Sequence, residues 1–81
     1  MYKVVIEESI KKDLKGVSKM DIAKIYKRIK SLENLLALDS LKLVNSEIYR
    51  IRQGNYRIFF EVDFQNEIIT VFKISHRKDA Y

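Results

Sequence analysis

Hydrophobic and polar residues alternate with a period of two over residues 47–53, and two further strand-like segments follow at residues 56–62 and 67–75. β-Branched and aromatic residues are frequent in all three segments, and this combination is typical of half-buried β-strands. Gly54-Asn55 separates the first two segments, and both residues tolerate a positive φ, so a tight hairpin is predicted there. Residues 63–66 turn the chain again, which gives three successive antiparallel strands.

The first half of the chain changes to a helical period after one short β-rich segment, residues 2–6. Ser9 is placed to cap a short helix that Gly16 ends. Ser18 is the next candidate N-cap, with Asp21 in the first turn of a longer helix over residues 20–38, which Asp39-Ser40 ends. Apolar residues recur at intervals of three and four along that helix and form one wide stripe, which predicts a core-facing side: Ile22, Ile25, Tyr26, Ile29, Leu32, Leu35 and Leu36.

The predicted element order is β-α-α-β-β-β within one domain, residues 1–81. We therefore expect an α+β fold in which two N-terminal helices pack on one face of a mainly antiparallel four-stranded sheet. Strand alternation assigns side chains to the two faces. The helix-covered face should hold Tyr49, Ile51, Ile58, Phe60, Val62, Phe72 and Ile74, and the open face Arg50, Arg52, Arg57, Phe59, Glu61 and Lys73.

Charge and composition limit the partners, cofactors and cellular location that can be expected. The 81 residues carry 16 Lys and Arg against 11 Asp and Glu, a net charge of +5, which favours anionic partners such as nucleic acid. Cysteine is absent, which excludes disulfides and thiolate metal sites, and the carboxylates show no metal-ligand spacing, so neither a metal nor a cofactor is expected. The chain shows no signal-peptide pattern and no long apolar run, so we expect a soluble, cytoplasmic protein without a membrane partner.

The arginines of the predicted hairpin are the first candidate site. Arg50 and Arg52 lie two positions apart on one strand, and Arg57 follows the hairpin on the next strand. Guanidinium groups stay charged and offer paired donors that match phosphate oxygens, so three of them would hold a phosphodiester and stabilise a pentacoordinate phosphorus. The same spacing also fits the solvated polar face of a half-exposed strand.

The end of the chain is the second candidate site, where His76, Arg77 and Lys78 precede Tyr81. A histidine can exchange a proton near neutral pH, and nearby cations favour the phenolate form of a tyrosine. A surface histidine at a strand end and a C-terminal tyrosine folded onto the sheet are the alternatives. The lysine-rich face of the long helix is either a solvated surface or a contact for nucleic-acid phosphates.

These motifs together resemble the RelE toxins of the RelE/ParE superfamily, and the resemblance extends over the whole chain. Its strongest parts are Tyr49-Arg50-Ile51-Arg52, Gly54-Asn55-Tyr56-Arg57 and the ending from His76 to Tyr81. Many relatives have lysines where Arg50 and Arg52 stand and a glycine where Ser75 stands, so the match is in pattern more than in identity.

The resemblance implies a toxin of a type II toxin–antitoxin system that cuts messenger RNA in the ribosomal A site. The ribose 2′-hydroxyl would attack the adjacent phosphate without a metal, giving a 2′,3′-cyclic phosphate and a 5′-hydroxyl. By the same resemblance, Tyr81 would be the base, Arg57 would hold the scissile phosphate, and Arg77 would be the proton donor or its electrostatic substitute. The remaining cationic positions would bind RNA: Arg50, Arg52, Lys73, His76 and Lys78.

The resemblance also implies a RelB-like antitoxin as partner, with operator DNA reached only through that antitoxin. An exposed basic groove beside apolar surface suits an acidic, amphipathic segment that folds on binding. Two other functions fit the same fold. A ParE-like chain would inhibit DNA gyrase by binding it, and a non-catalytic member would only hold nucleic acid or its antitoxin.

Overall fold

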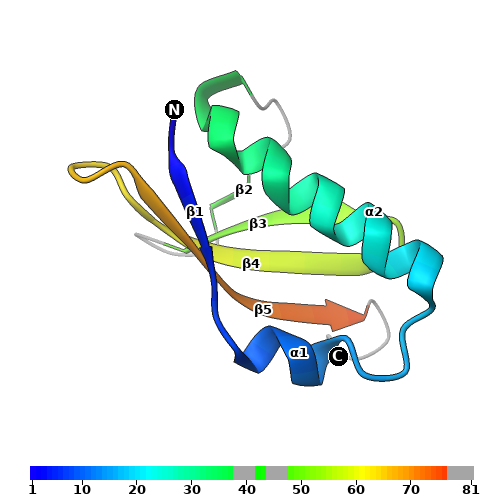
Figure 1. Ribbon diagram of the computed structural model, residues 1–81. Helices are drawn as coiled ribbons and strands as arrows, with labels where there is room; N and C mark the ends of the chain where they lie inside the picture. The colour runs from blue at the N-terminus through cyan, green and yellow to red at the C-terminus, as the bar shows by residue number, and fades with distance from the viewer. Residues whose placement is uncertain (38–41, 44–47, 77–81) are drawn as a thin grey trace.

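The computed structural model describes residues 1–37, 42–43 and 48–76, which form one mixed sheet with helices on one side (Figure 1). The strand order is β1-β5-β4-β3-β2. β1 runs parallel to β5, and the other neighbouring pairs are antiparallel. The elements are β1 (Lys3–Ile6), α1 (Ser9–Asp13), α2 (Lys19–Lys30), the 3₁₀ helix η1 (Ser31–Ala37), β2 (Lys42–Leu43), β3 (Ile48–Gln53), β4 (Tyr56–Asp63) and β5 (Ile68–His76).

The α+β class and the strand positions agree with the sequence prediction, but the description of a mainly antiparallel sheet below N-terminal helices needs correction. The first strand precedes the helices and pairs in parallel with the last strand, from Lys3 opposite Ile68 to Ile6 opposite Val71. The helices form the crossover between β1 and the rest of the sheet. A short additional strand, β2, extends the far edge beside β3. No local pattern reveals the pairing of β1 with β5, because it joins residues far apart in sequence.

Helix α2 forms where the apolar stripe and its cap predict it. Ser18 is the N-cap, and its Oγ accepts a hydrogen bond of 3.2 Å from the backbone N–H of Asp21. Ile25 and Ile29 are buried against the sheet, whereas Tyr26, predicted in the stripe, is 40% exposed. Tyr26 directly follows Ile25, and the 100° rotation between adjacent helical positions turns it away from the sheet. No helix in the described part of the chain is long and apolar enough to span a membrane.

The α-helix ends at Lys30, earlier than predicted, and the chain continues as the 3₁₀ helix η1. Ser31 Oγ donates a hydrogen bond to the backbone carbonyl of Arg28, so a side chain occupies one carbonyl oxygen of the last helical turn. Asn34 has φ of −107° and ψ of 51°, which interrupts the helical backbone further. Leu32 is still fully buried, so the apolar stripe continues into η1. The predicted end at residues 38–40 lies outside the described residues.

Helix α1 covers the edge of β5 beyond the point where β1 stops. The predicted Ser9 cap is wrong, because Glu8 takes the N-cap position without a side-chain bond and Ser9 Oγ instead donates to the carbonyl of Phe72 at 3.3 Å. Asp13 Oδ2 accepts the backbone N–H of Ile74 at 2.9 Å. Side chains of α1 therefore satisfy backbone groups of β5 that a neighbouring strand would otherwise pair.

The core lies between the helices and the covered face of the sheet. Phe60, Ile58 and Ile69 are fully buried at its centre, and Phe60 stacks on Tyr49 with ring centroids 5.9 Å apart. The predicted inward positions of β3 and β4 are confirmed. The buried hydrophobic residues of the described chain are Ile10, Leu14, Ile25, Ile29, Leu32, Ile51, Ile58, Phe60, Val62, Ile69, Val71 and Ile74.

A β-bulge in β5 corrects one predicted inward residue. Phe59 of β4 pairs with Lys73, but the next residue, Phe60, pairs with Val71, so Phe72 is an extra residue on β5. Val71 and Ile74 are therefore both buried on the helix side, although they are three positions apart, and Phe72 is only half-buried. Strict alternation cannot produce this arrangement.

The two turns between the last three strands use different backbone solutions. Gly54 has φ of +59° in the hairpin, and no positive φ occurs at Asn55, an arrangement that matches a type II′ turn with glycine first. In the second turn, Asp63 Oδ1 and Oδ2 accept hydrogen bonds from the backbone N–H and the Nδ2 of Asn66, at 3.1 and 2.8 Å. Glu67 has φ of 54° and belongs to this turn, so β5 begins one residue later than predicted.

Candidate nucleic-acid interface

Four cationic side chains share the sheet face that no described helix covers, as predicted. We call Arg50, Arg52, Arg57 and Lys73 the cationic strand surface. The registers of β3, β4 and β5 place these side chains together. Arg52 lies opposite Arg57, and Phe59 lies between Arg50 and Lys73. Two rows therefore cross the sheet, one with Arg52, Arg57 and Ser75 and one with Arg50, Phe59 and Lys73. Residues two apart on a strand are roughly 7 Å apart, so the four charges occupy one compact area.

Two of these cations, Arg52 and Arg57, are direct cross-strand partners. Like charges at directly opposite positions destabilise a sheet. Arg52 Nε donates to the carbonyl of Gly54 at 3.3 Å, which draws its side chain toward the hairpin. An anion bound between the two guanidinium groups would offset their repulsion and accept donors from both. The arrangement thus favours a phosphate-sized anion.

His76 does not lie with these arginines. It is two residues beyond the buried Ile74 and pairs with Tyr56, which packs against the core on the helix side. The Tyr56 and His76 rings meet edge to face with centroids 5.0 Å apart. The sheet therefore separates His76 from the strand arginines, and its expected part in RNA binding stays a prediction. The other predicted residues near the chain end, Arg77, Lys78 and Tyr81, lie outside the described residues.

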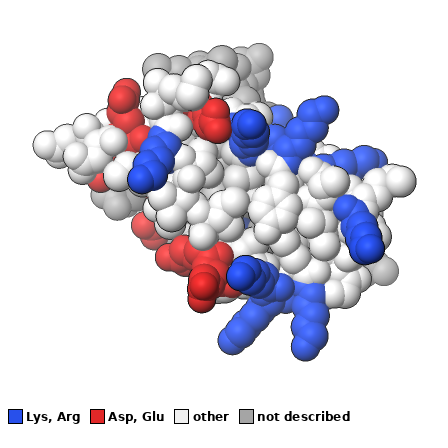
Figure 2. Space-filling view, viewed as in Figure 1, with Lys and Arg blue, Asp and Glu red and all other residues white. Residues whose placement is uncertain are grey.

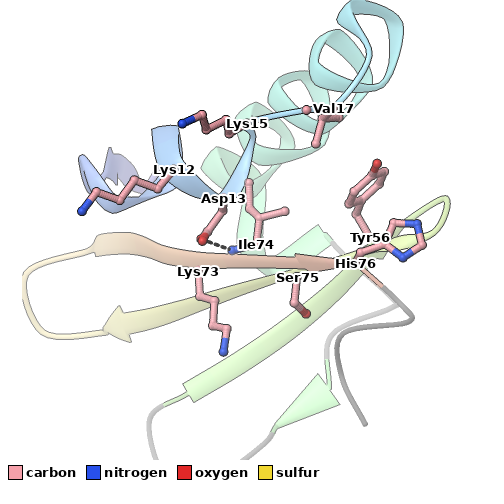
Figure 3. A pocket seen from close by; sticks show the side chains of 10 residues that line it. Lys12, Asp13, Lys15, Val17, Tyr56, Lys73, Ile74, Ser75 and His76 are labelled. Carbon is pink, nitrogen blue, oxygen red and sulfur yellow. Dashed lines mark hydrogen bonds between the residues drawn. The ribbon is translucent and has the colours of Figure 1, made fainter.

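A pocket of about 500 Å³ opens beside the C-terminal part of β5 (Figure 3). We call it the edge pocket. Lys12 in α1 and Lys15 in the turn that follows belong to its lining, and Tyr56 and His76 lie on the same side of the sheet. Lys73 and Ser75 project from the opposite side of β5, so the pocket extends around the strand edge.

Sequence reasoning missed Lys12, Lys15 and Tyr56 as candidate site residues. Lys12 and Lys15 are far from the hairpin in sequence and join the pocket only because α1 packs on β5. Tyr56 belongs to the hairpin motif Gly54-Asn55-Tyr56-Arg57, but its contact with His76 depends on the β4–β5 register. Strand alternation could have predicted the position of His76. It places Ile74 on the helix side of the sheet and therefore places His76, two residues later, on the same side.

A second basic pocket, of about 480 Å³, lies where α2 faces the end of β3 and is lined by Lys24, Lys27, Arg28, Ser31 and Gln53. Figure 2 shows that most lysine and arginine side chains on the helix-covered side gather over α1 and α2, with acidic side chains mainly toward the other end. The basic surface therefore includes α1 as well as the predicted basic face of the long helix. It lies on the helix side of the molecule, at the end that carries the hairpin.

Asp13 is the one carboxylate among the described residues that line the two pockets. Within residues 1–37, 42–43 and 48–76, no three His, Cys, Asp or Glu side chains form a group suited to a metal ion. The pKa of Asp63 is lowered by the hydrogen bond from the Asn66 side chain and then by the one from its backbone N–H. Asp63 lies in the β4–β5 turn, at the end of β4 away from the arginine hairpin, and its bonds stabilise that turn.

Comparison with known proteins identifies the family. Residues 4–81 match the family model described as the ParE toxin of type II toxin–antitoxin systems, parDE. The chain is a toxin of the RelE/ParE superfamily. It is 36% identical to the toxin RelE3 of Methanocaldococcus jannaschii over 85 residues, which span 98% of this chain and 94% of that protein.

Solved structures of RelE proteins have the same fold as this RelE/ParE toxin. The RelB–RelE antitoxin–toxin complex from Methanococcus jannaschii aligns with a TM-score of 0.76 and 30% identity, over 95% of this chain and 94% of that one. The archaeal RelE–RelB complex from Pyrococcus horikoshii OT3 gives a TM-score of 0.77 at 22% identity, over 94% of each chain, a similarity of fold alone. The family predicted from the strand and C-terminal motifs is confirmed.

Proposed function

We propose that this toxin is a ribosome-dependent messenger RNA endoribonuclease that cuts codons in the A site. The observation that carries the proposal is the cationic strand surface, where two cross-strand rows bring Arg50, Arg52, Arg57 and Lys73 together on one sheet face. Fixed, paired donors on a rigid sheet suit a phosphodiester and the extra negative charge of its transition state. The similarity to the toxin RelE3 along almost the whole chain supports the same conclusion.

The proposed reaction is an in-line transfer at phosphorus that needs no metal. The 2′-oxygen forms a bond to the adjacent phosphorus as its proton passes to Tyr81, and the bond from phosphorus to the 5′-oxygen breaks. The products are a 2′,3′-cyclic phosphate and a 5′-hydroxyl that takes up one proton. Arg57 holds the non-bridging oxygens, and Arg50 and Arg52 stabilise the developing charge. Arg77 donates the proton to the leaving oxygen or stabilises it electrostatically, while Lys73 and Lys78 bind flanking phosphates.

The proposal includes an antitoxin partner and a cytoplasmic location. The Methanococcus jannaschii relative is solved as a RelB–RelE complex, and this similarity supports a RelB-like antitoxin for the present chain. Such a partner would inactivate the toxin by covering basic surface with an acidic, folding segment. Operator DNA would be contacted only through the antitoxin. The ribosome would supply the ordered single-stranded codon that the small toxin cannot enclose by itself.

The decisive experiment is induction of the wild type, Arg57→Ala and Tyr81→Phe in cells, followed by mapping of transcript 5′ ends. We expect cuts inside translated codons for the wild type and loss of these cuts in both variants. Lys30→Gln is a matched control, because Lys30 is an exposed cation of α2 that lines neither pocket. Wild-type cuts that persist in Arg57→Ala would contradict the assignment of the cationic strand surface.

Inhibition of DNA gyrase is the second candidate, favoured by the match to a ParE toxin model. A toxin of this kind would act by protein binding and would leave transcripts intact. A gyrase supercoiling assay with the purified toxin separates the two functions. Inhibition of supercoiling together with growth arrest and uncut messenger RNA would replace the nuclease proposal. Growth without arrest would indicate a member that only binds nucleic acid or antitoxin.

A further inference from the structure

The edge pocket combines cations with aromatic rings. Lys12 and Lys15 are exposed on its helix side, and the half-buried residues Tyr56 and His76 line its wall. Proteins that hold single-stranded nucleic acid combine these two features, cations for the backbone and rings for the bases. We propose that the edge pocket is a second RNA subsite that binds a nucleotide flanking the cleaved bond. The inference rests on the proposed nuclease function and adds a site to it.

The first argument is continuity with the cationic strand surface. Ser75 lines the edge pocket and is the direct cross-strand partner of Arg57. Lys73 belongs to both sites, since it lines the pocket and lies beside Phe59 in the second row. One strand spacing, about 4.8 Å, separates Arg57 from the strand that carries both residues. An RNA strand that leaves Arg57 toward β5 therefore reaches the edge pocket next.

The second argument is the shape of the strand edge. β1 pairs with β5 only as far as Val71, so the C-terminal part of β5 is not covered by another described strand on that side. α1 approaches this edge but ends at Asp13, opposite Ile74. The pocket lies beside the turn that follows, and Lys15 and Gly16 of this turn line it. The backbone of a single RNA strand can thus pass around the edge of β5 from one face of the sheet to the other.

The third argument is charge. Asp13 is a carboxylate among three lysines of the pocket lining, Lys12, Lys15 and Lys73, so the lining is net positive. Its Oδ2 accepts the Ile74 N–H at 2.9 Å, which directs the carboxylate to the protein backbone (Figure 3). An acidic peptide would satisfy the lysines, but a nucleotide satisfies the lysines and the ring wall together. The lining and its continuity with the strand arginines therefore favour RNA.

His76 allows a direct measurement, because it is the single histidine of the chain. The experiment titrates the full-length toxin, separated from its antitoxin, with a single-stranded RNA heptamer whose 2′-O-methyl riboses prevent in-line cleavage. The His76 ring proton resonances report on the pocket, and fluorescence anisotropy reports total binding. We expect the His76 resonances to shift and to saturate with the same dissociation constant as the anisotropy.

Charge variants test the lysines. We expect Lys12→Gln/Lys15→Gln to reduce the slope of log affinity against log salt by about 1.4, since each single-strand phosphate contact contributes about 0.7. The matched control is Lys11→Gln/Lys30→Gln, which removes two exposed lysines of α1 and α2 that line neither pocket. The control should keep the wild-type slope. Circular dichroism confirms that each variant is folded.

Three results would overturn the subsite. If the His76 resonances stay unchanged and Lys12→Gln/Lys15→Gln keeps the wild-type slope, while Arg52→Gln/Arg57→Gln loses binding, RNA occupies the cationic strand surface alone and the proposed function stands. If neither the wild type nor any variant binds the RNA, the subsite fails, and the ribosome-dependent function is decided separately by the transcript 5′ ends. If RNA binding is unaffected but Lys12→Gln/Lys15→Gln escapes neutralisation by a co-expressed antitoxin, the pocket belongs to the acidic partner.

Discussion

The two faces of β4 are chemically opposite although their residues alternate along one strand. Ile58, Phe60 and Val62 are buried beneath the helices, whereas Arg57 and Glu61 point to the other side. The covered face supplies the apolar burial that an 81-residue domain needs for stability. The open face carries the cations of the proposed site. Stability and activity should therefore respond to different, neighbouring positions.

The largest expected effect is on the covered face. Phe60→Ala should lower the free energy of unfolding by about 3–5 kcal/mol, because it leaves a cavity at a fully buried position. Phe59→Ala, at the adjacent half-buried position on the open face, should cost much less. Urea unfolding measures both. Equal losses would show that the open face contributes to the core and that the two faces are not separable.

On the open face the effect should be on activity. Arg57→Ala should reduce the rate of A-site cleavage in purified ribosomes about 100-fold, the usual consequence of losing one donor to a transition-state oxyanion. Its urea unfolding curve should move far less than that of Phe60→Ala, since Arg57 is only half-buried. A large loss of stability with an unchanged cleavage rate would reverse the roles assigned to the two faces.

A smaller effect is expected where α1 meets β5. Asp13→Ala should lower the unfolding free energy by about 1–2 kcal/mol, because the Ile74 N–H loses its carboxylate acceptor. Asp13→Asn should restore part of the loss, since its amide oxygen can still accept that bond. Thermal unfolding of the three proteins measures the difference. A stable Asp13→Ala variant would indicate that apolar contacts alone attach α1 to the strand edge.

The smallest effect concerns the turn after β4. The pKa of Asp63 lies below its ordinary value of 3.8, so ionised Asp63 stabilises the folded state above that pH. This contribution is fully present at neutral pH and is lost as the pH falls through the lowered, folded-state pKa. The stability difference between wild type and Asp63→Asn should therefore shrink as the pH falls below about 3.8. If the stability difference does not change with pH, the hydrogen bonds from Asn66 are not the cause of the lowered pKa of Asp63.

Much of the fold and part of the candidate site follow from the sequence alone. The period-two segments, the Gly54 turn and the Ser18 cap are local signals, and each of these elements forms where it is predicted. The shared face of Arg50, Arg52 and Arg57 follows equally directly, because alternation along a strand and a two-residue hairpin fix it. The family resemblance rests on the strand and hairpin motifs and on the ending from His76 to Tyr81.

Tertiary structure decided the features that depend on distant partners. The parallel pairing of β1 with β5 and the bulge at Phe72 reflect packing of the whole sheet, and the bulge lets Val71 and Ile74 share one face. The separation of His76 from the arginines, and its place in one pocket lining with Lys12 and Lys15, depend on the same register and on where α1 ends. A local pattern specifies which way a side chain points along its own element, but contacts between elements are set by how their apolar faces can be buried together.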